Sequence, residues 1–151
     1  MEIIEKLETT KLKTLGYYDL KAEHLDRSYG TDKWTVRFIL HHLADAETVL
    51  YERIRRVISE PKLLLGAFDQ DAWAKKLDYS SVPLELSKQI YAAVRDGIIY
   101  NARQHYESSG HREFVHNETG IRTLKQEFDK VAAHNEYHLQ QIGKALNGSR
   151  S

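Results

Sequence analysis

The sequence predicts an all-α protein, a single four-helix bundle that spans residues 1–151. Four long stretches carry apolar residues at the three- and four-residue spacing of an amphipathic helix. Only two prolines, Pro61 and Pro83, interrupt the chain. No segment shows a convincing period-two alternation, which would indicate a strand. Four amphipathic helices without strands are typical of a helical bundle.

The first two helices follow from these apolar stripes and from the residues at their ends. The first is predicted over roughly residues 2–27, with Lys11 interrupting its apolar stripe. The segment Tyr29–Asp32 is predicted to be a loop. The second helix is expected to begin after Thr35, which can cap it, and to end near Glu60, because a proline follows.

The third helix is predicted to begin near Pro83, since proline suits a first helical turn. The fourth is predicted to begin near Thr123, which forms a capping box with Gln126. The connection 61–82, roughly 22 residues, is long and is expected to pack and to include a short helical turn. Extended, it would reach ~70 Å, whereas a 25-residue helix is only ~38 Å long. Helices two and three can therefore run parallel in an up-down-down-up order.

Composition excludes several classes of protein. The 22 basic and 22 acidic residues balance, which argues against a protein that binds nucleic acid or a membrane surface. No apolar run is long enough to span a membrane. Cysteine is absent, which excludes disulfides and thiolate metal ligands and agrees with a cytoplasmic location. Any metal site must therefore use nitrogen and oxygen ligands.

The eight histidines include a pair with metal-ligand spacing. His134 and His138 are four residues apart on one predicted helix, so their rings lie close enough to share an ion. Val131 and Ile142 place the pair on the inward stripe. Buried neutral imidazoles need hydrogen bonds or a metal, so the pair is either two satisfied core histidines or two metal ligands.

His42 is the candidate for a third ligand. Apolar residues flank it on the adjacent helical turns, whereas charged residues flank His41. We therefore expect His42 to point inward and His41 to be an exposed or boundary residue. If helices two and four are antiparallel, the depth of His42 matches that of the C-terminal pair. The remaining sites His24, His111 and His116 are expected to lie on the surface or in loops.

Four further residues are candidates to support such a site. Asp45 and Gln141 each lie one turn after a candidate ligand and could orient it, although an ordinary polar boundary role is open for both. Arg37 could bind an anionic group in a pocket or form a surface salt bridge. His105, at the end of the third helix, could line the pocket or lie at the core edge.

Three separated blocks resemble the DinB-like superfamily, most closely the branch of YfiT-type metal-dependent hydrolases. The stretch Trp34–Asp45 resembles its W-[ST]-V-R-x-x-x-x-H-L-A-D signature, with Leu25-Asp26 upstream at similar spacing. The segment Phe68–Trp73 and the pattern His134-x-x-x-His138, followed by Gln141-Ile142, resemble later blocks in the same order.

The resemblance implies a four-helix bundle with up-down-down-up topology and one divalent metal ion, zinc or nickel, on His42, His134 and His138. It also implies a homodimer and a small-molecule substrate, in some members a low-molecular-weight thiol such as bacillithiol. Three protein ligands would leave a position open for catalysis. Asn135, rather than a glutamate, follows His134, which favours a thiol S-transferase over peptide hydrolysis. Hydrolysis of a small molecule and a non-catalytic metal-binding bundle remain alternatives.

Overall fold

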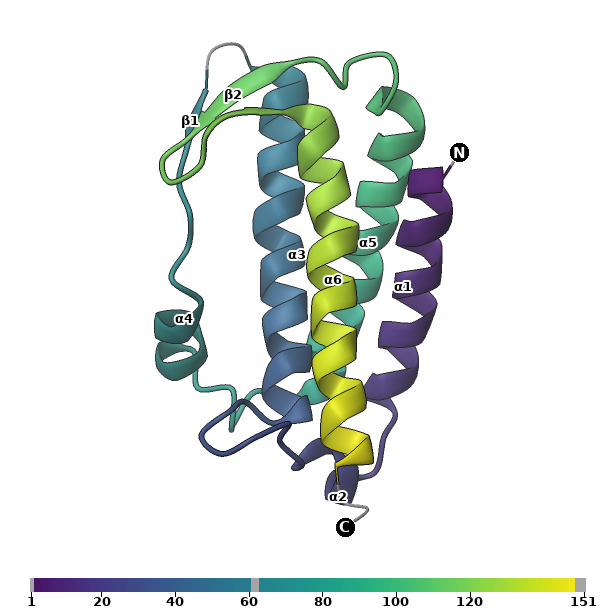
Figure 1. The fold of residues 1–151 in the computed structure, drawn as a ribbon, viewed down its shortest axis with the longest axis vertical. Coiled ribbons are helices and arrows are strands. Elements are labelled where there is room, and N and C mark those ends of the chain that lie inside the picture. Colours follow the sequence, from purple (N-terminus) through teal and green to yellow (C-terminus); the bar gives the residue numbers. More distant parts are fainter. Residues whose placement is uncertain (1, 61–62, 149–151) are drawn as a thin grey trace.

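The computed structural model describes residues 2–60 and 63–148. Four long helices form its bundle (Figure 1), and they are α1 (Glu2–Tyr18), α3 (Val36–Ser59), α5 (Leu84–His105) and α6 (Leu124–Asn147). Their apolar faces meet in the interior, where the buried apolar residues form two clusters. None of the described helices is both long and apolar enough to cross a membrane.

Figure 1 shows that α3 and α5 run in the same direction, whereas α1 and α6 run the opposite way. Contacts between the helices agree with this order. On α3 and α5, His41 meets Ser87 and Glu47 meets Arg95, so the partner numbers rise together. Between α3 and α6 the partner numbers run in opposite directions, because His42 contacts His134 whereas the later residue Arg53 contacts the earlier residue Glu127. The expected up-down-down-up order is therefore confirmed.

The long connection between α3 and α5 runs along the outside of the bundle, as its length required. It contains the short strand β1 (Leu64–Leu65) and the predicted helical turn, which is α4 (Gln70–Lys76). Asp69 caps α4 by accepting a hydrogen bond from the Ala72 backbone N–H, at 2.9 Å. Pro61, which was expected to end the second helix, lies outside the described residues.

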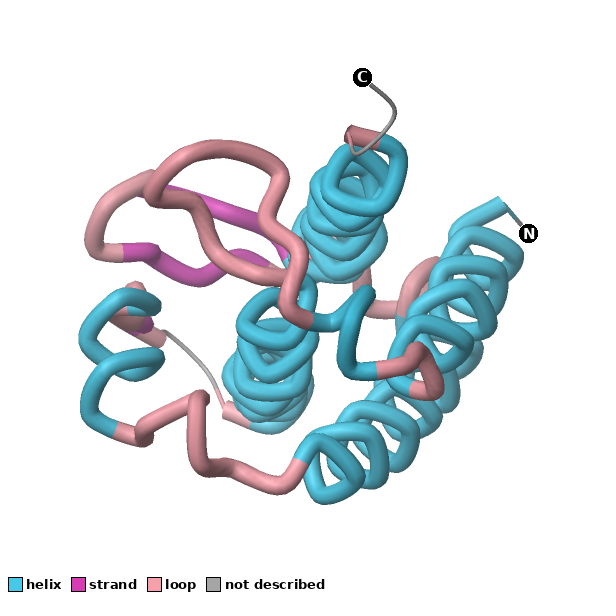
Figure 2. Tube along the Cα trace, turned by 90° about the horizontal axis from the view of Figure 1, so that it is seen from below, coloured by secondary structure: helices cyan, strands magenta, loops and turns pink. Residues whose placement is uncertain are grey.

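The all-α class is confirmed, but the expectation that the chain contains no strand is wrong in one small region. Strands β2 (Glu113–His116) and β3 (Gly120–Thr123) form an antiparallel hairpin, and β1 pairs with β2 in parallel. Figure 2 shows this sheet and α4 beside the α3–α6 pair, on the side away from α1. The alternating burial in β2 covers only four residues, too few to stand out as a period in the sequence.

The first predicted helix is divided in two. α1 ends at Tyr18, and a single turn, α2 (Ala22–Leu25), follows. The break lets Leu25 turn under the end of the bundle, where it packs in the same apolar cluster as Tyr18. The Tyr18 hydroxyl donates a hydrogen bond to the Leu40 carbonyl at 2.6 Å, which fixes this end of α1 against α3. A straight helix to residue 27 would leave Leu25 without these apolar contacts.

Both predicted N-caps are confirmed. The Thr35 side chain accepts a hydrogen bond from the Phe38 backbone N–H at the start of α3, at 3.2 Å. Thr123 and Gln126 form the reciprocal capping box at the start of α6. Because these caps fix where the two helices begin, they also fix the level at which their histidines enter the interior.

Candidate metal centre

Helices α3 and α6 bring three histidines together at one level of the bundle. His42 lies in the second turn of α3 and is fully buried. His134 and His138 project from adjacent turns of α6, where His138 is buried and His134 is partly exposed. Because α3 and α6 are antiparallel, the early part of one helix faces the late part of the other. The convergence expected for these three residues is therefore present.

The Nε2 atoms of the three rings point at one another. The Nε2 atom of His134 lies 3.1 Å from the Nε2 atom of His42 and 3.1 Å from that of His138. One ligand nitrogen from each ring lies within 4.8 Å of the other two. The ring planes of each pair are steeply inclined to one another, so the lone pairs converge from three directions.

A chain of side chains orients His138. Its Nδ1 atom lies 2.7 Å from the Oε1 atom of Gln141, and the Nε2 group of Gln141 donates to the Tyr29 hydroxyl at 3.1 Å. An amide oxygen only accepts, so the proton of neutral His138 belongs on Nδ1. The Nε2 atom of His138 then presents a lone pair to the other two rings. This is the orienting contact that was expected of Gln141.

Aromatic rings enclose the inner part of the cluster. The Trp34 ring centroid lies 5.1 Å from that of His42, and Phe68 stacks on the same imidazole at 6.2 Å. Burial is the main cause that lowers the pKa of His42 to about 2 and the pKa of His134 to about 3. Burial also lowers the pKa of His138. All three rings are therefore neutral at neutral pH, the form in which imidazole binds a metal.

The three rings suit a divalent cation better than they suit one another. With a proton on Nδ1 of His138, a single N–H at His134 can serve only one of its two Nε2 neighbours. The Nδ1 atom of His42 is buried and has no hydrogen-bond partner among the described residues. A cation accepts all three lone pairs at once. Metal–nitrogen bonds of about 2.0–2.1 Å at tetrahedral angles separate the nitrogens by about 3.3 Å, close to the spacing here.

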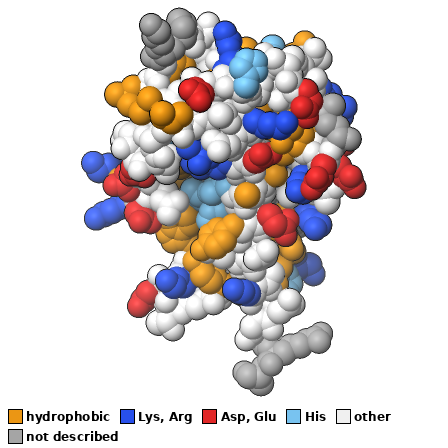
Figure 3. Space-filling model, turned by 45° about the horizontal axis from the view of Figure 1, so that its top comes forward, with side chains coloured by type: hydrophobic (Ala, Val, Ile, Leu, Met, Phe, Trp, Pro, Cys, Tyr) orange, Lys and Arg blue, Asp and Glu red, His pale blue; other side chains and the backbone are white. Residues whose placement is uncertain are grey.

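A pocket of about 360 Å³ opens onto His134 and His138. Its walls come from the loop before α3, from the start of α4 and from α6, and they include Tyr29, Lys33, Trp34, Asp71, Tyr137 and Gln141. Figure 3 shows histidine side chains at the molecular surface on this side, among hydrophobic and cationic groups. A small molecule in the pocket can therefore reach the ring nitrogens.

The structure moves three of the supporting candidates away from the histidines. Asp45 accepts a hydrogen bond from the Tyr79 hydroxyl and contacts none of the three rings, so it does not orient a ligand. Arg37 forms a surface ion pair with Asp26 at 3.3 Å. Arg37 and His105 are both absent from the described walls of this pocket. Of the two alternatives considered for each residue, the structure therefore favours a surface salt bridge for Arg37 and a position outside the pocket for His105.

Two other histidines are buried, contrary to expectation. His41 is only 1% exposed, and its Nδ1 atom lies 2.6 Å from the Ser87 hydroxyl of α5. The connection after α3 covers it through Tyr79, whose ring centroid lies 5.3 Å away. His116 is buried on β2, where its Nδ1 atom accepts hydrogen bonds from the backbone N–H groups of residues 118 and 119. The sequence around these two histidines does not show which distant segments cover them in the fold.

Several residues that build the site could not be recognised from the sequence. Tyr29, Lys33 and Asp71 reach the pocket from loops and from a short helix whose position depends on the whole fold. The buried pair of Arg95 and Glu47 was also missed, because an isolated charge on a helix usually indicates a solvated position. Only mutual proximity in the folded state distinguishes these residues from surface polar groups.

The fold and the site together define a helical-bundle protein with three histidines placed where they could hold a metal ion. The sequence model of the DinB superfamily matches residues 12–142, and the chain belongs to this superfamily. The region that matches this family model contains all three histidines of the site.

Relatives carry names that concern metals. One from Oceanobacillus iheyensis, named "Putative metal-dependent hydrolase", is 32% identical over 124 residues, or 82% of this chain and 72% of its own. A second protein of that organism with the same kind of name is 28% identical over 130 residues, or 86% of this chain and 75% of its own. YfiT from Bacillus subtilis, described as a probable metal-dependent hydrolase with an unusual four-helix bundle topology, matches in structure. The match has a TM-score of 0.86 at 24% identity and covers 95% of this chain and 83% of YfiT, which establishes the shared fold.

Proposed function

We propose that this protein is a metal-dependent enzyme that acts on a small molecule at His42, His134 and His138. The observation that carries the proposal is the convergence of the Nε2 atoms of three neutral histidines beside an open pocket, which reaches two of them, His134 and His138. A structural zinc site is usually closed by four protein ligands, whereas three ligands beside a pocket are typical of a catalytic ion. The names of the relatives support a metal-dependent reaction.

The three histidines would hold the ion, and the residues around them would shape the space in which the substrate reacts. Gln141 and Tyr29 fix the ring of His138, and Trp34 with Phe68 keeps water away from the inner side of His42. When bound, zinc or nickel supplies Lewis acidity that lowers the pKa of a coordinated water or thiol toward neutrality. The pocket therefore suits either hydrolysis of a small substrate or transfer to a low-molecular-weight thiol.

Thiol transfer is the reaction that we favour. Water on such an ion keeps a pKa of about 7, so hydrolysis still gains from a base beside the attacking water. Asp45, the acid nearest to a ligand in sequence, is bound to Tyr79 and not to the site, and the two carboxylates of the pocket wall, Asp32 and Asp71, are exposed groups of a loop and of α4. A thiol that loses its proton on binding needs no such base, because the nucleophile is already ionised. We also propose a cytoplasmic homodimer, which light scattering of the purified protein would check.

The test combines metal content with activity. Protein purified without a nickel column should contain one zinc or nickel ion per chain by elemental analysis, and the His138→Ala variant should contain less than a tenth of that. A panel of thiols with a chromogenic electrophile, beside a panel of small esters and amides, should show turnover that a chelator abolishes. The exposed His111 provides the matched control, and His111→Ala should keep both metal and turnover. Turnover that survives the chelator and the His138→Ala change would exclude the metal mechanism.

Because Asp45 is bound to Tyr79 and not to the site, a second candidate function is also favoured, in which the ion has a non-catalytic role in the bundle. Such a protein should lose much of its thermal stability on chelation and should show no turnover with either panel. It should also complete the coordination of the ion with a fourth protein group. Absorption spectra of the cobalt-substituted protein would decide this, because an open position responds to added thiol and a closed one does not.

A further inference from the structure

A polar stripe continues along α6 beyond the metal centre. Its members recur at spacings of three and four residues, which places them on one face of the helix, and they are Glu127, Lys130, His134, His138 and Gln141. This face looks onto α3, because Glu127 contacts Arg53 and His134 contacts His42. The polar seam between the two helices therefore runs from the pocket to the hairpin.

Lys130 differs from the other members of this stripe. It is half-buried, yet its ammonium group has no hydrogen bond and no ion pair within the described part of the chain. Its position one turn before His134 places it about 6 Å from that residue along the helix axis. Its positive charge is among the causes that lower the pKa of His134, which agrees with this proximity.

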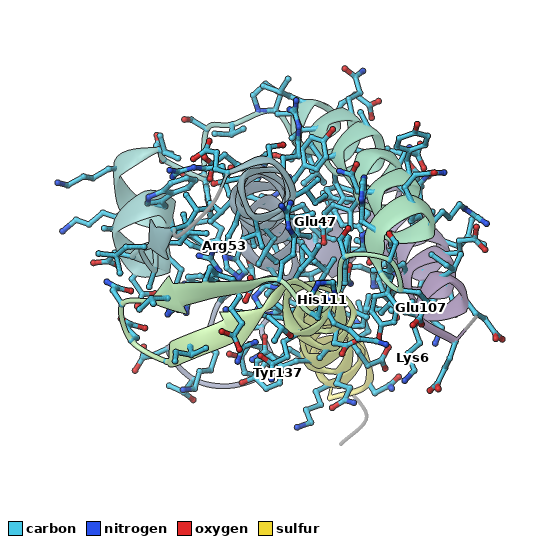
Figure 4. All side chains as sticks on the ribbon, turned by 90° about the horizontal axis from the view of Figure 1, so that it is seen from above. Lys6, Glu47, Arg53, Glu107, His111 and Tyr137 are labelled. Carbon is cyan, nitrogen blue, oxygen red and sulfur yellow. The ribbon has the colours of Figure 1, made fainter. Side chains whose placement is uncertain are left out.

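The one nearby buried carboxylate is already occupied. The Oε2 atom of Glu127 lies 3.1 Å from the Arg53 guanidinium, and its Oε1 atom lies 3.4 Å from Nε of Arg122. Figure 4 shows Arg53 between α3 and the hairpin, close to this end of the seam. Two arginines therefore share Glu127, and Lys130 has no carboxylate in direct contact with its ammonium group among the described residues, although the charges of Glu127 and Glu118 act on its pKa.

The lack of a partner is unfavourable for a half-buried ammonium group. Burial lowers the pKa of Lys130 even though the Glu127 carboxylate acts to raise it, so the group is partly desolvated. A cation that gives up hydration without gaining a partner costs stability. An anionic ligand would supply the missing interaction and would meet an ammonium group already partly stripped of water.

We propose that Lys130 binds an anionic group of the substrate, such as a carboxylate, about one helical turn from the reacting atoms. This inference rests on the proposed function and adds the charge of its substrate. Lys130 lies outside the described walls of the pocket, so it would be reached by a substrate that coordinates beside His134 and extends past the pocket along α6 toward the hairpin. The residue is then a determinant of specificity, and removal of its charge weakens the binding of anionic ligands alone.

Lys33 offers a competing position for the same anion. It lies in the wall of the pocket, on the loop before α3, and it is exposed. An anion bound at Lys33 would extend toward that loop and away from the hairpin. The test must therefore distinguish these two lysines from each other and from a general effect of net charge.

The experiment measures the binding of two thiols to the cobalt-loaded full-length protein by visible absorption at constant ionic strength. The probes are 3-mercaptopropionate and 3-mercaptopropan-1-ol, which differ mainly in charge and which can coordinate an open metal position whatever reaction the enzyme performs. The native protein should bind the anionic thiol about 5- to 10-fold more tightly. Lys130→Met should remove this preference, leave the affinity for the neutral thiol within about 2-fold, and leave the cobalt stoichiometry unchanged.

Three further variants make the result decisive. Lys130→Arg should keep the preference, as should Lys33→Met and Lys144→Met, the last removing an exposed charge from α6. Equal binding of the two thiols by the native protein, or loss of the preference in Lys33→Met but not in Lys130→Met, would overturn the inference and leave the proposed function intact. Failure of cobalt or of both thiols to bind would overturn the proposed function, and this inference with it.

Discussion

His116 is a buried residue whose two ring nitrogens have different surroundings. Its Nδ1 atom accepts hydrogen bonds from the backbone N–H groups of Glu118 and Thr119, at 3.2 and 3.3 Å. Its Nε2 atom is buried and has no hydrogen-bond partner among the described residues. Burial lowers the pKa of His116 below its usual 6.5, and the charge of Arg53 acts in the same direction. The ring is therefore a neutral acceptor that closes the hairpin turn.

The pH dependence of stability tests this reading. Because the folded pKa is lower than the unfolded value of 6.5, the contribution is complete above that value and is lost as pH falls toward the folded pKa. The native protein, measured with chelator present, should therefore lose more stability between neutral pH and about pH 5 than His116→Asn does. Asparagine keeps an acceptor but does not titrate. Urea denaturation at the two pH values gives the difference, and exposed His111→Asn should leave the native pH dependence unchanged.

Gln141 tests how far one neighbouring side chain controls the metal centre. Gln141→Leu removes the acceptor that holds the Nδ1 proton of His138. We expect metal affinity to fall by about 10-fold, since loss of an orienting partner typically costs that much. Competition with a chromogenic chelator measures the affinity. The adjacent Gln140 is exposed, and Gln140→Leu should bind metal as the native protein does. Equal affinities for the two variants would contradict the orienting role.

At the scale of elements, the hairpin and α6 are continuous. β3 ends at Thr123, and the same residue caps α6, so the strand and the helix share one junction. The backbone of Gly120 has φ of 76°, a left-handed conformation that favours glycine and allows the chain to turn into β3. The position of the hairpin over the α3–α6 seam therefore depends on where α6 begins.

The capping box at this junction should contribute to stability. Thr123→Ala removes the side-chain acceptor for the Gln126 backbone N–H and should destabilise the protein by about 1 kcal/mol. The urea midpoint of the metal-free protein measures the effect. Thr119 is an exposed residue of the hairpin turn, and Thr119→Ala should change stability by less than about 0.5 kcal/mol. Similar losses in the two variants would show that the cap itself contributes little.

At the scale of the whole molecule, one buried cation connects the four helices. Arg95 of α5 donates to Glu47 of α3 at 2.9 Å, to Asn135 of α6 at 2.6 Å, and to the Leu7 carbonyl and the Thr10 hydroxyl of α1 at 2.9 and 2.8 Å. Figure 4 shows Glu47 pointing into the space between the helices. Asn135 is adjacent to His134, so this network fixes the rotation of α6 near the metal centre.

Removal of the counterion should be costly. Glu47→Ala leaves the guanidinium of Arg95 buried without its carboxylate, and we expect a loss of about 3–5 kcal/mol in the free energy of unfolding. Glu52→Ala, on the exposed side of the same helix, should change it by less than about 0.5 kcal/mol. Chemical denaturation followed by circular dichroism measures both. A loss below about 1 kcal/mol for Glu47→Ala would mean that water replaces the carboxylate.

The extent to which the sequence predicted this structure differs between kinds of feature. The four long helices, the caps at Thr35 and Thr123 and the parallel order of α3 and α5 follow from periodicity, from local hydrogen bonding and from the length of one connection. The division of the first helix and the hairpin were missed. Each depends on distant contacts, such as the packing of Leu25 beneath the bundle, that leave no periodic signal along the chain.

The sequence by itself determined the candidate ligands, because inward orientation depends on helical spacing and an H-x-x-x-H pair on one face is a local property. Only the tertiary structure decided which polar residues serve them. Gln141 joined the site, whereas Asp45 turned to Tyr79, and Lys130 was left half-buried beside His134. The physical reason is that a side chain's partners are set by the elements that pack over it, and those elements are far away in the sequence.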